Sequence, residues 1–203
     1  MKTRIIGVYH TFEAGHFSRL YEKIGELPER SKIGLELTRK DAELMHEVLR
    51  RKAFSLSFFL WAGAHSVEKG HQVIALDSSF GYRKHLQAEE KTKTSKNTEE
   101  TEKSVRNEEV LTTLRSKFML QRILKEKPDV AIVGIGHARE IEKVGLKVEY
   151  HKGPLWWRIK EFFSDTLQGY LTKLFVPKAF ERKERIIQEM RKMVEEHESR
   201  TKD

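Results

Sequence analysis

The feature that most constrains the fold is a regular alternation of short aliphatic segments with longer amphipathic ones. The short segments are rich in Ile, Val and Leu and bounded by glycine or turn residues; they lie at residues 3–10, 32–38, 72–77 and 129–137, with a fifth candidate at 146–150. Such runs are typical of buried strands. Strands that alternate with helices favour parallel pairing, because a parallel connection needs a long crossover. We therefore expect an α/β fold with a mostly parallel or mixed central sheet flanked by helices.

Between these runs, apolar residues recur every three or four positions, as they do on one face of a helix. Amphipathic helices are predicted at residues 13–27, 41–49 and 111–123. The apolar segment 53–67 is shorter than the roughly 20 residues that cross a bilayer as a helix, so it predicts a buried helix.

The chain is predicted to divide into an α/β domain at residues 1–153 and an amphipathic C-terminal helical extension at residues 154–203. The wide apolar face at 155–175 must be covered. We favour packing on the protein's own sheet, with a homodimer through the C-terminal helices or peripheral membrane contact as alternatives. The last helix, at 178–198, has a narrower apolar stripe that suits an antiparallel partner helix.

A polar loop is predicted at about residues 81–104. Within it, residues 91–103 contain no apolar residue and therefore have no face to bury. We favour a passive surface loop over a lid.

Composition excludes several classes of protein. None of the 203 residues is Cys, so disulfides, thiolate zinc sites and cysteine nucleophiles are excluded. The formal net charge is +8, from 39 basic and 31 acidic residues. These charges are intermixed, which argues against nucleic-acid binding. High charge without Cys is typical of heat-adapted proteins, and the lack of a secretory signal pattern predicts a cytoplasmic location.

Ionisable residues stand at the ends of the first four predicted strands. His10 and His137 end the first and fourth runs, Glu36 lies near the end of the second, and Asp77 ends the third. Burying such groups without partners costs free energy. Since ligands of parallel α/β sheets bind beyond the carboxyl ends of the strands, these residues predict a functional site.

The two histidines share a Gly-x-x-His pattern and allow two kinds of chemistry. Imidazole binds divalent metals and also acts as a general base near neutral pH. If His10 and His137 converge beside Glu36, they would form a three-ligand site for Mn, Co or Zn with a position open for water. Without metal, one histidine would deprotonate water directly, oriented by Glu36 or Asp77.

Two arginines are further candidates. Arg39 follows the second predicted strand and Arg115 lies on the predicted helix at 111–123. A guanidinium there could clamp a carboxylate or stabilise an oxyanion. The sequence lacks a dinucleotide-binding Gly-x-Gly-x-x-Gly after the first strand, a phosphate-binding loop and a Gly-x-Ser-x-Gly turn, which argues against dehydrogenases, P-loop ATPases and serine hydrolases.

The order and spacing of these segments resemble the TraB/PrgY/GumN family and its relatives, the Tiki proteases, erythromycin esterases and ChaN-like proteins. The resemblance rests on the segments IIGVYHT at 5–11, IGLELTR at 33–39, VIALD at 73–77, LRSKFM at 114–119 and VAIVGIGHARE at 130–140. It implies a metal-dependent peptidase or a related hydrolase on a mixed-sheet α/β fold, with functional residues at His10, Glu36, Arg115 and His137.

Two hypotheses of function follow. The first is a hydrolase that cleaves amide or ester bonds in a peptide or small molecule, using His10, Glu36 and His137 to hold a metal or to activate water. The second is a non-enzymatic binding or regulatory module that holds a peptide or small ligand in the same crevice. Association of the basic surface with nucleic acid is a weaker third hypothesis.

Overall fold

A computed structural model gives the structure of residues 3–9, 14–43, 45, 58–78, 98–151 and 177–200, and for residues 14–17, 98–109 and 177–178 it describes the backbone alone. The predictions for His10, the segments 46–57 and 79–97, and the apolar face at 155–175 with its dimer and membrane alternatives lie outside these residues.

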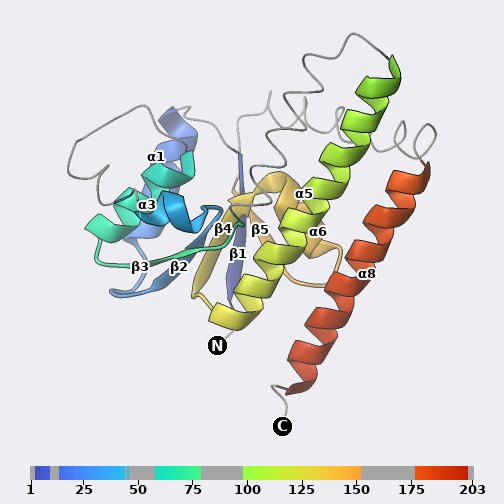
Figure 1. The fold of residues 1–203 in the computed structure, drawn as a ribbon. Coiled ribbons are helices and arrows are strands. Elements are labelled where there is room, and N and C mark those ends of the chain that lie inside the picture. The colour runs from blue at the N-terminus through green and yellow to red at the C-terminus, as the bar shows by residue number, and fades with distance from the viewer. Residues whose placement is uncertain are drawn as a thin grey trace.

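The described strands form one parallel sheet (Figure 1). They are β1 (Arg4–Val8), β2 (Lys32–Leu35), β3 (Gln72–Ala75), β4 (Val130–Gly134) and β5 (Val148–Tyr150). Their order across the sheet is β3-β2-β4-β1-β5, and every neighbouring pair is parallel. The predicted α/β architecture is confirmed. All carboxyl ends of the strands therefore meet at the same edge.

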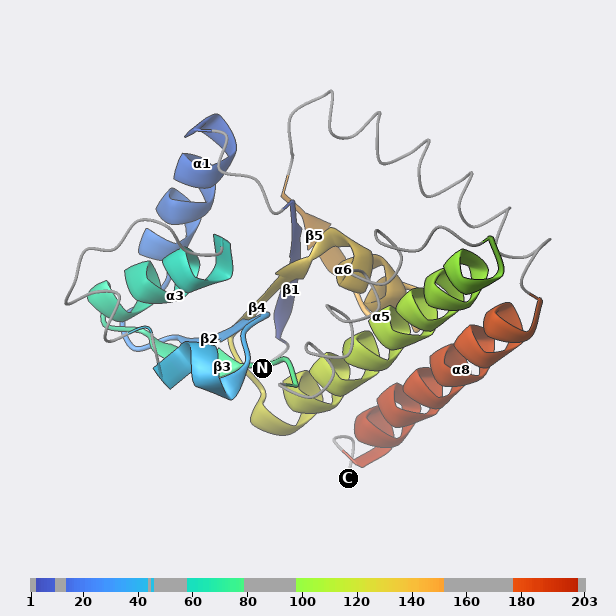
Figure 2. The ribbon, with the colours of Figure 1, turned by 45° about the horizontal axis from the view of Figure 1, so that its top comes forward.

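Helices cover both faces of the sheet (Figures 1 and 2). On one face lie α1 (Ala14–Gly25) and α3 (Phe58–Glu68). On the other lie α5 (Thr98–Glu126), α6 (Ile135–Glu142) and α8 (Pro177–Arg200). Within the described residues, no helix is both long enough and apolar enough to cross a membrane.

Alternating side chains of the strands fill two separate cores. In β4, Val130 and Ile132 pack into the cluster under α1 and α3, whereas Ala131 and Val133 pack into the cluster under α5, α6 and α8. This is the two-residue period of a strand buried on both faces. The continuous aliphatic runs in the sequence follow directly from this double burial.

The fourth predicted strand extends too far. β4 ends at Gly134 and α6 begins at Ile135, so the expected strand at 129–137 is wrong beyond Gly134. Ala138, Ile141 and Val144 are buried at intervals of three, which is a helical spacing. His137 therefore lies in the first turn of a helix rather than at the end of a strand.

Gly7 owes its place to packing between β1 and α6. A Cβ atom built on Gly7 would lie 2.7 Å from the Cβ of Ala138. Real Cβ atoms do not approach this closely, so the helix sits against the strand only because Gly7 has no side chain. The first Gly-x-x-His pattern thus begins with a structural glycine.

The last helix packs parallel to its partner, not antiparallel as predicted. Lys117 of α5 contacts Glu189 of α8, and Gln121, one turn further along α5, contacts Met193, one turn further along α8. Both helices run in the same direction in Figures 1 and 2. The apolar stripe is buried as expected, since Ile187 and Val194 face the core. A stripe specifies which face is buried but leaves the direction of the helix open.

The predicted polar loop at 81–104 is too long at its carboxyl end. α5 already begins at Thr98, so residues 98–104 are helical. Helix propensity of the Glu and Lys residues there explains the extension.

Candidate active site

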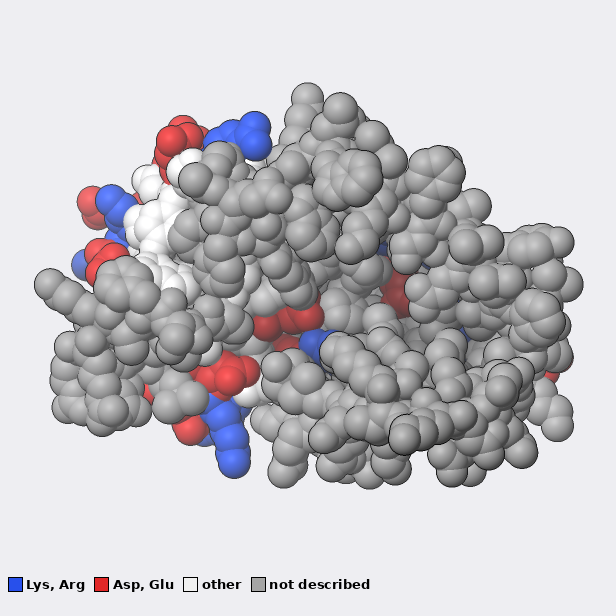
Figure 3. Space-filling view, turned by 90° about the horizontal axis from the view of Figure 1, so that it is seen from above, with Lys and Arg blue, Asp and Glu red and all other residues white. Residues whose placement is uncertain are grey.

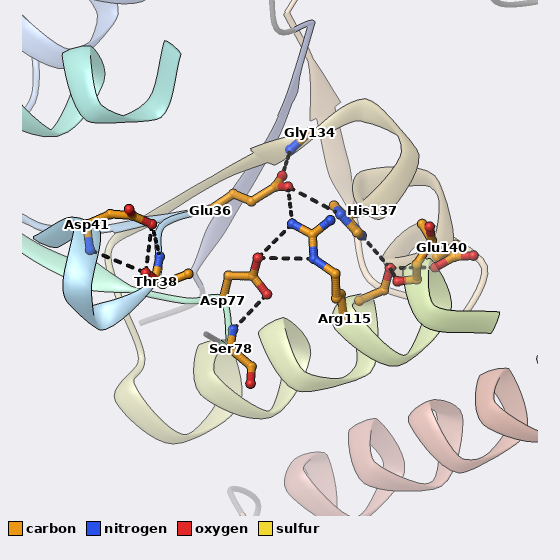
Figure 4. Close-up of polar contacts among 11 residues, drawn as sticks. Glu36, Thr38, Asp41, Asp77, Ser78, Arg115, Gly134, His137 and Glu140 are labelled. Atoms are coloured by element: carbon orange, nitrogen blue, oxygen red, sulfur yellow. Dashed lines mark hydrogen bonds and ion pairs between the residues drawn. The ribbon is translucent and has the colours of Figure 1, made fainter. Parts of the chain in front are cut away.

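Four polar side chains meet at the carboxyl edge of the sheet (Figure 4). Glu36 follows β2 directly, Asp77 lies two residues beyond β3, Arg115 projects from α5, and His137 lies in the first turn of α6. Because β3, β2 and β4 are neighbours, the turns that follow them are adjacent. This is the edge at which parallel α/β sheets bind ligands.

The turn after β2 is fixed by its own hydrogen bonds. The backbone N–H and hydroxyl of Thr38 both donate to Asp41 Oδ2, at 2.9 and 2.7 Å, and the Asp41 N–H donates to Thr38 Oγ1 at 3.3 Å. This reciprocal cap starts the helical segment at 39–43. Glu36 itself is held at the sheet edge by its backbone N–H, which donates to the Ile132 carbonyl oxygen of β4 at 3.2 Å.

Arg115 is clamped between two carboxylates. Its Nη2 lies 2.6 Å from Asp77 Oδ2 and 2.9 Å from Glu36 Oε1, and its Nε donates to Asp77 Oδ2 at 3.1 Å. Burial by itself would lower the pKa of the guanidinium, but the hydrogen bond and charge of Asp77 and the charge of Glu36 raise it above its usual value. Arg115 is therefore a permanent cation in the site.

Glu36 also meets His137 and the backbone. His137 Nε2 lies 3.3 Å from Glu36 Oε1, the oxygen that Arg115 contacts. The other oxygen, Oε2, accepts the Gly134 N–H at 2.7 Å. Gly134 is the N-cap of α6, so this bond places the carboxylate at a helix N-terminus, where negative charge is stabilised. Glu36 is thus the centre of the cluster.

A second network holds the far side of the imidazole. Ser116 Oγ lies 2.7 Å from His137 Nδ1 and donates to Glu140 Oε2 at 2.5 Å. Glu140 Oε1 accepts the Thr113 hydroxyl at 2.7 Å and lies 3.4 Å from Nζ of Lys183 on α8. Both ring nitrogens of His137 therefore have polar neighbours.

The side chains of the cluster are almost completely buried. The side chains of Glu36, Arg115 and His137 are 6–7% exposed, and that of Asp77 is 2% exposed. Figure 3 looks onto this edge of the sheet and shows acidic side chains beside a basic one near the centre of the face. At this burial the charges are stable only because they are paired.

The structure brings together four of the six predicted site residues: Glu36, Asp77, Arg115 and His137. Arg39 is placed elsewhere. Its side chain is 91% exposed and pairs with Glu43 at 3.5 Å on its own helix. His10 lies outside the described residues, so its predicted meeting with His137 stays a prediction.

Sequence reasoning missed Thr113, Ser116 and Glu140. All three lie close in sequence to a predicted member of the site: Glu140 is three residues after His137, Ser116 directly follows Arg115, and Thr113 is two residues before Arg115. Reading residues 135–142 as a helix would have placed Glu140 on the same face as His137. Because residues up to 137 were expected to form a strand, the helical spacing of His137 and Glu140 was not recognised.

The described residues do not by themselves complete a metal site. Among them, no group of three His, Asp or Glu side chains could hold a metal ion. Glu36 and His137 supply two donors, and the Arg115 cation already contacts the same Glu36 oxygen. A divalent ion at that oxygen would face charge repulsion from the guanidinium. The metal hypothesis therefore depends on His10.

We compared the chain with protein-family models, curated proteins and solved structures, and none of the three comparisons gave a match.

Proposed function

We propose that the protein is a hydrolase of amide or ester bonds, in which His137 and Glu36 activate water. The observation that carries the proposal is the contact of His137 Nε2 with Glu36 Oε1 at 3.3 Å, beside the Arg115 cation and at the carboxyl edge of the sheet. A histidine can take a proton from a reacting group, and a carboxylate beside the ring stabilises the imidazolium that results.

In the proposed reaction, Nε2 of His137 takes a proton from water as the water attacks the carbonyl carbon. The Glu36 carboxylate stabilises the imidazolium that forms. The imidazolium then returns the proton to the leaving nitrogen or oxygen. Arg115 holds Glu36 in place through their ion pair of 2.9 Å. Asp77 fixes the guanidinium through two hydrogen bonds.

The resemblance to the TraB/PrgY/GumN family supports the same class of reaction, with a metal as an added component. If His10 joins Glu36 and His137, the three side chains would hold a metal ion, which would acidify the attacking water. Metal analysis of protein purified without chelator tests this directly. Retention of metal by the double variant His10→Ala and His137→Ala would exclude a metal-binding role for these histidines.

The test of the proposed function is hydrolysis of a panel of peptides, amides and esters, measured with added Mn, Co or Zn and with chelator. We expect His137→Gln and Glu36→Gln each to lower kcat/KM by about 10²–10⁴-fold, the usual contribution of a positioned acid or base. Glu149→Gln is the matched control, because Glu149 pairs with Arg4 at a distance from the site. Equal activity of all three variants would contradict the proposal.

The binding-module hypothesis is favoured by one observation: Asp77 and Glu36 already neutralise Arg115. In that case no member of the panel would be hydrolysed, while a bound peptide or small molecule would raise Tm in the wild type. The Glu36→Gln variant should then lose the rise in Tm.

A further inference from the structure

A buried series of hydrogen bonds runs from His137 through Ser116 to Glu140. The number of hydrogens available determines which group donates and which accepts in each bond. Ser116 has one hydroxyl hydrogen, yet three acceptor atoms lie near its Oγ: Glu140 Oε2 at 2.5 Å, His137 Nδ1 at 2.7 Å and the Thr112 carbonyl oxygen at 3.1 Å. A hydroxyl donates to one strong acceptor at a time and accepts from others. The donor and acceptor roles in this series therefore depend on which neighbour receives the Ser116 hydrogen.

Glu140 is the neighbour that receives it. Its Oε1 accepts the Thr113 hydroxyl at 2.7 Å and lies 3.4 Å from the Lys183 ammonium, while its side chain is only 6% exposed. The Thr113 hydroxyl and the Lys183 ammonium both direct hydrogens toward this carboxylate, so it meets its neighbours as an acceptor. An ionised carboxylate has no hydrogen to give, so the short contact with Ser116 needs the hydroxyl hydrogen of Ser116.

With its hydrogen committed to Glu140, Ser116 meets His137 as an acceptor. The contact of 2.7 Å between Ser116 Oγ and Nδ1 then requires a hydrogen on Nδ1. We propose that Ser116 and Glu140 are positioning residues that keep a hydrogen on Nδ1 of His137, so that Nε2, which lies 3.3 Å from Glu36 Oε1, is the nitrogen that gains and loses the reacting proton. Histidines that act as bases are commonly held in this way by a carboxylate on the opposite nitrogen. Here the carboxylate acts through a serine hydroxyl.

The same geometry excludes Ser116 as a nucleophile. Its side chain is fully buried, and its hydroxyl hydrogen is directed to Glu140 rather than to the imidazole. In a nucleophilic triad, the serine donates to the histidine and faces the substrate. The direction of the chain is therefore opposite to that of a serine hydrolase.

This inference rests on the proposed function only in naming Nε2 as the reacting nitrogen. The hydrogen on Nδ1 is a property of the folded protein without substrate. A measurement of where the His137 ring carries its hydrogen therefore tests this inference separately from any measurement of hydrolysis.

The test is long-range ¹H–¹⁵N spectroscopy of histidine labelled with ¹⁵N in the full chain, with His137→Gln used to assign the signals. We expect the Nδ1 signal of His137 to show the shift of a protonated nitrogen at every pH at which the protein is folded. A cross-peak from the Nδ1 hydrogen to the Ser116 β-hydrogens should accompany it. A neutral ring with its hydrogen on Nε2 would overturn the proposal.

Glu140→Gln gives a second, sharper test. Thr113 and Lys183 both donate toward the Oε1 position, so the amide oxygen of the substituted side chain should take that side and its NH₂ should face Ser116. Ser116 would then accept from the amide and donate to Nδ1 at 2.7 Å, which is nearer than the Thr112 carbonyl oxygen at 3.1 Å. We expect the hydrogen of the neutral His137 ring to move from Nδ1 to Nε2, with a fall in kcat and little change in KM. Unchanged ring signals in this variant would overturn the proposal.

Two further variants control for folding. Glu142→Gln lies on the same helix and loses only an exposed contact with Tyr150, so the His137 signals should stay as in the wild type. If Glu140→Gln does not fold, Ser116→Ala removes the acceptor itself. It should abolish the cross-peak and shift the Nδ1 signal, and a wild-type Nδ1 signal in Ser116→Ala would equally overturn the assignment.

Discussion

At the scale of single residues, burial makes each polar group dependent on its partners. His65 shows this outside the site: its ring stacks on Tyr21 with centroids 3.6 Å apart, and its Nε2 lies 3.3 Å from the Tyr21 carbonyl oxygen. Burial lowers the pKa of His65; the bond to Tyr21 opposes this shift, with smaller effects from Lys69, Glu68 and His71. A buried imidazole is thus held in its neutral form.

The lowered pKa of His65 predicts a loss of stability in acid. Below about pH 6.5, the usual pKa of histidine, the unfolded chain takes up a proton at this position more readily than the folded chain. Stability contributed by neutral His65 is therefore present above pH 6.5 and lost as the pH falls through the lowered value. We expect His65→Phe to flatten this part of the curve of unfolding free energy against pH, measured by urea denaturation.

Tyr21→Phe is the control for this prediction. It keeps the stacked ring and removes only the hydroxyl, whose pKa is raised to about 12 by burial and by the charge of Glu68. A group with this pKa does not titrate in acid, so the acid slope should persist. An acid slope that survives in His65→Phe would contradict the assignment to His65.

The close approach of β1 and α6 at Gly7 predicts that a side chain there lowers the free energy of unfolding. Gly7→Val should lower the free energy of unfolding by about 1–3 kcal/mol or more, because the added atoms overlap Ala138. Gly136→Ala is the matched control, since a Cβ atom there meets no described atom within 4 Å and alanine favours the helix by about 0.5–1 kcal/mol. Thermal unfolding of both variants checks the contrast. Equal stability of Gly7→Val and wild type would be inconsistent with the close approach.

At the scale of elements, α8 belongs to the packed core of the α/β unit. Its buried residues Ile186, Ile187, Met190 and Val194 share one cluster with α5 and α6. Lys183 adds a polar contact from α8 to Glu140, next to the candidate site. The last helix therefore contributes to both stability and the environment of the site.

Met190 gives the prediction for this helix. Its side chain is fully buried, so Met190→Ala should lower the free energy of unfolding by about 2–5 kcal/mol through lost burial and a residual cavity. Gln188→Ala, on the exposed face of the same helix, should change it by less than about 0.5 kcal/mol. Urea denaturation separates the two, and similar values would indicate that α8 is not docked on α5.

At the scale of the whole molecule, Arg115 links elements that are far apart in the sequence. One guanidinium on α5 joins the turn after β2 to the turn after β3, and Glu36 extends the link to β4 and α6. Because each of these charges is buried, the removal of one leaves the others without compensation. The cluster thus also holds the turns after β2 and β3 together with β4, α5 and α6.

Arg115→Met tests this link. We expect a loss of about 3–5 kcal/mol, because Asp77 and Glu36 would remain buried without their cation. The control is Arg4→Met, which breaks the exposed pair of Arg4 and Glu149 and should cost about 0–1 kcal/mol. Adding Asp77→Asn to Arg115→Met should recover part of the stability. A loss in Arg115→Met no greater than that in Arg4→Met would contradict the role of the buried cluster.

Much of the fold was determined by the sequence alone. Aliphatic runs and helical stripes depend on local spacing, and both cores require that spacing, so the parallel sheet and its flanking helices were predictable. The polar residues at the strand ends were also visible, because an unpaired charge has no stabilising role in such a position. Glu36, Asp77 and His137 were named on this basis, whereas Arg115 was named for the chemistry of its guanidinium on a predicted helix and from the family resemblance.

Only the tertiary structure decided which of these groups meet and how. The pairing of Arg115 with two carboxylates depends on the strand order, which places the ends of β2 and β3 side by side. The roles of Ser116 and Glu140 depend on α6 starting at Ile135, and the parallel course of α8 depends on a partner helix about 70 residues earlier in the chain. Local periodicity determines which face of an element is buried, whereas long-range packing determines what that face meets.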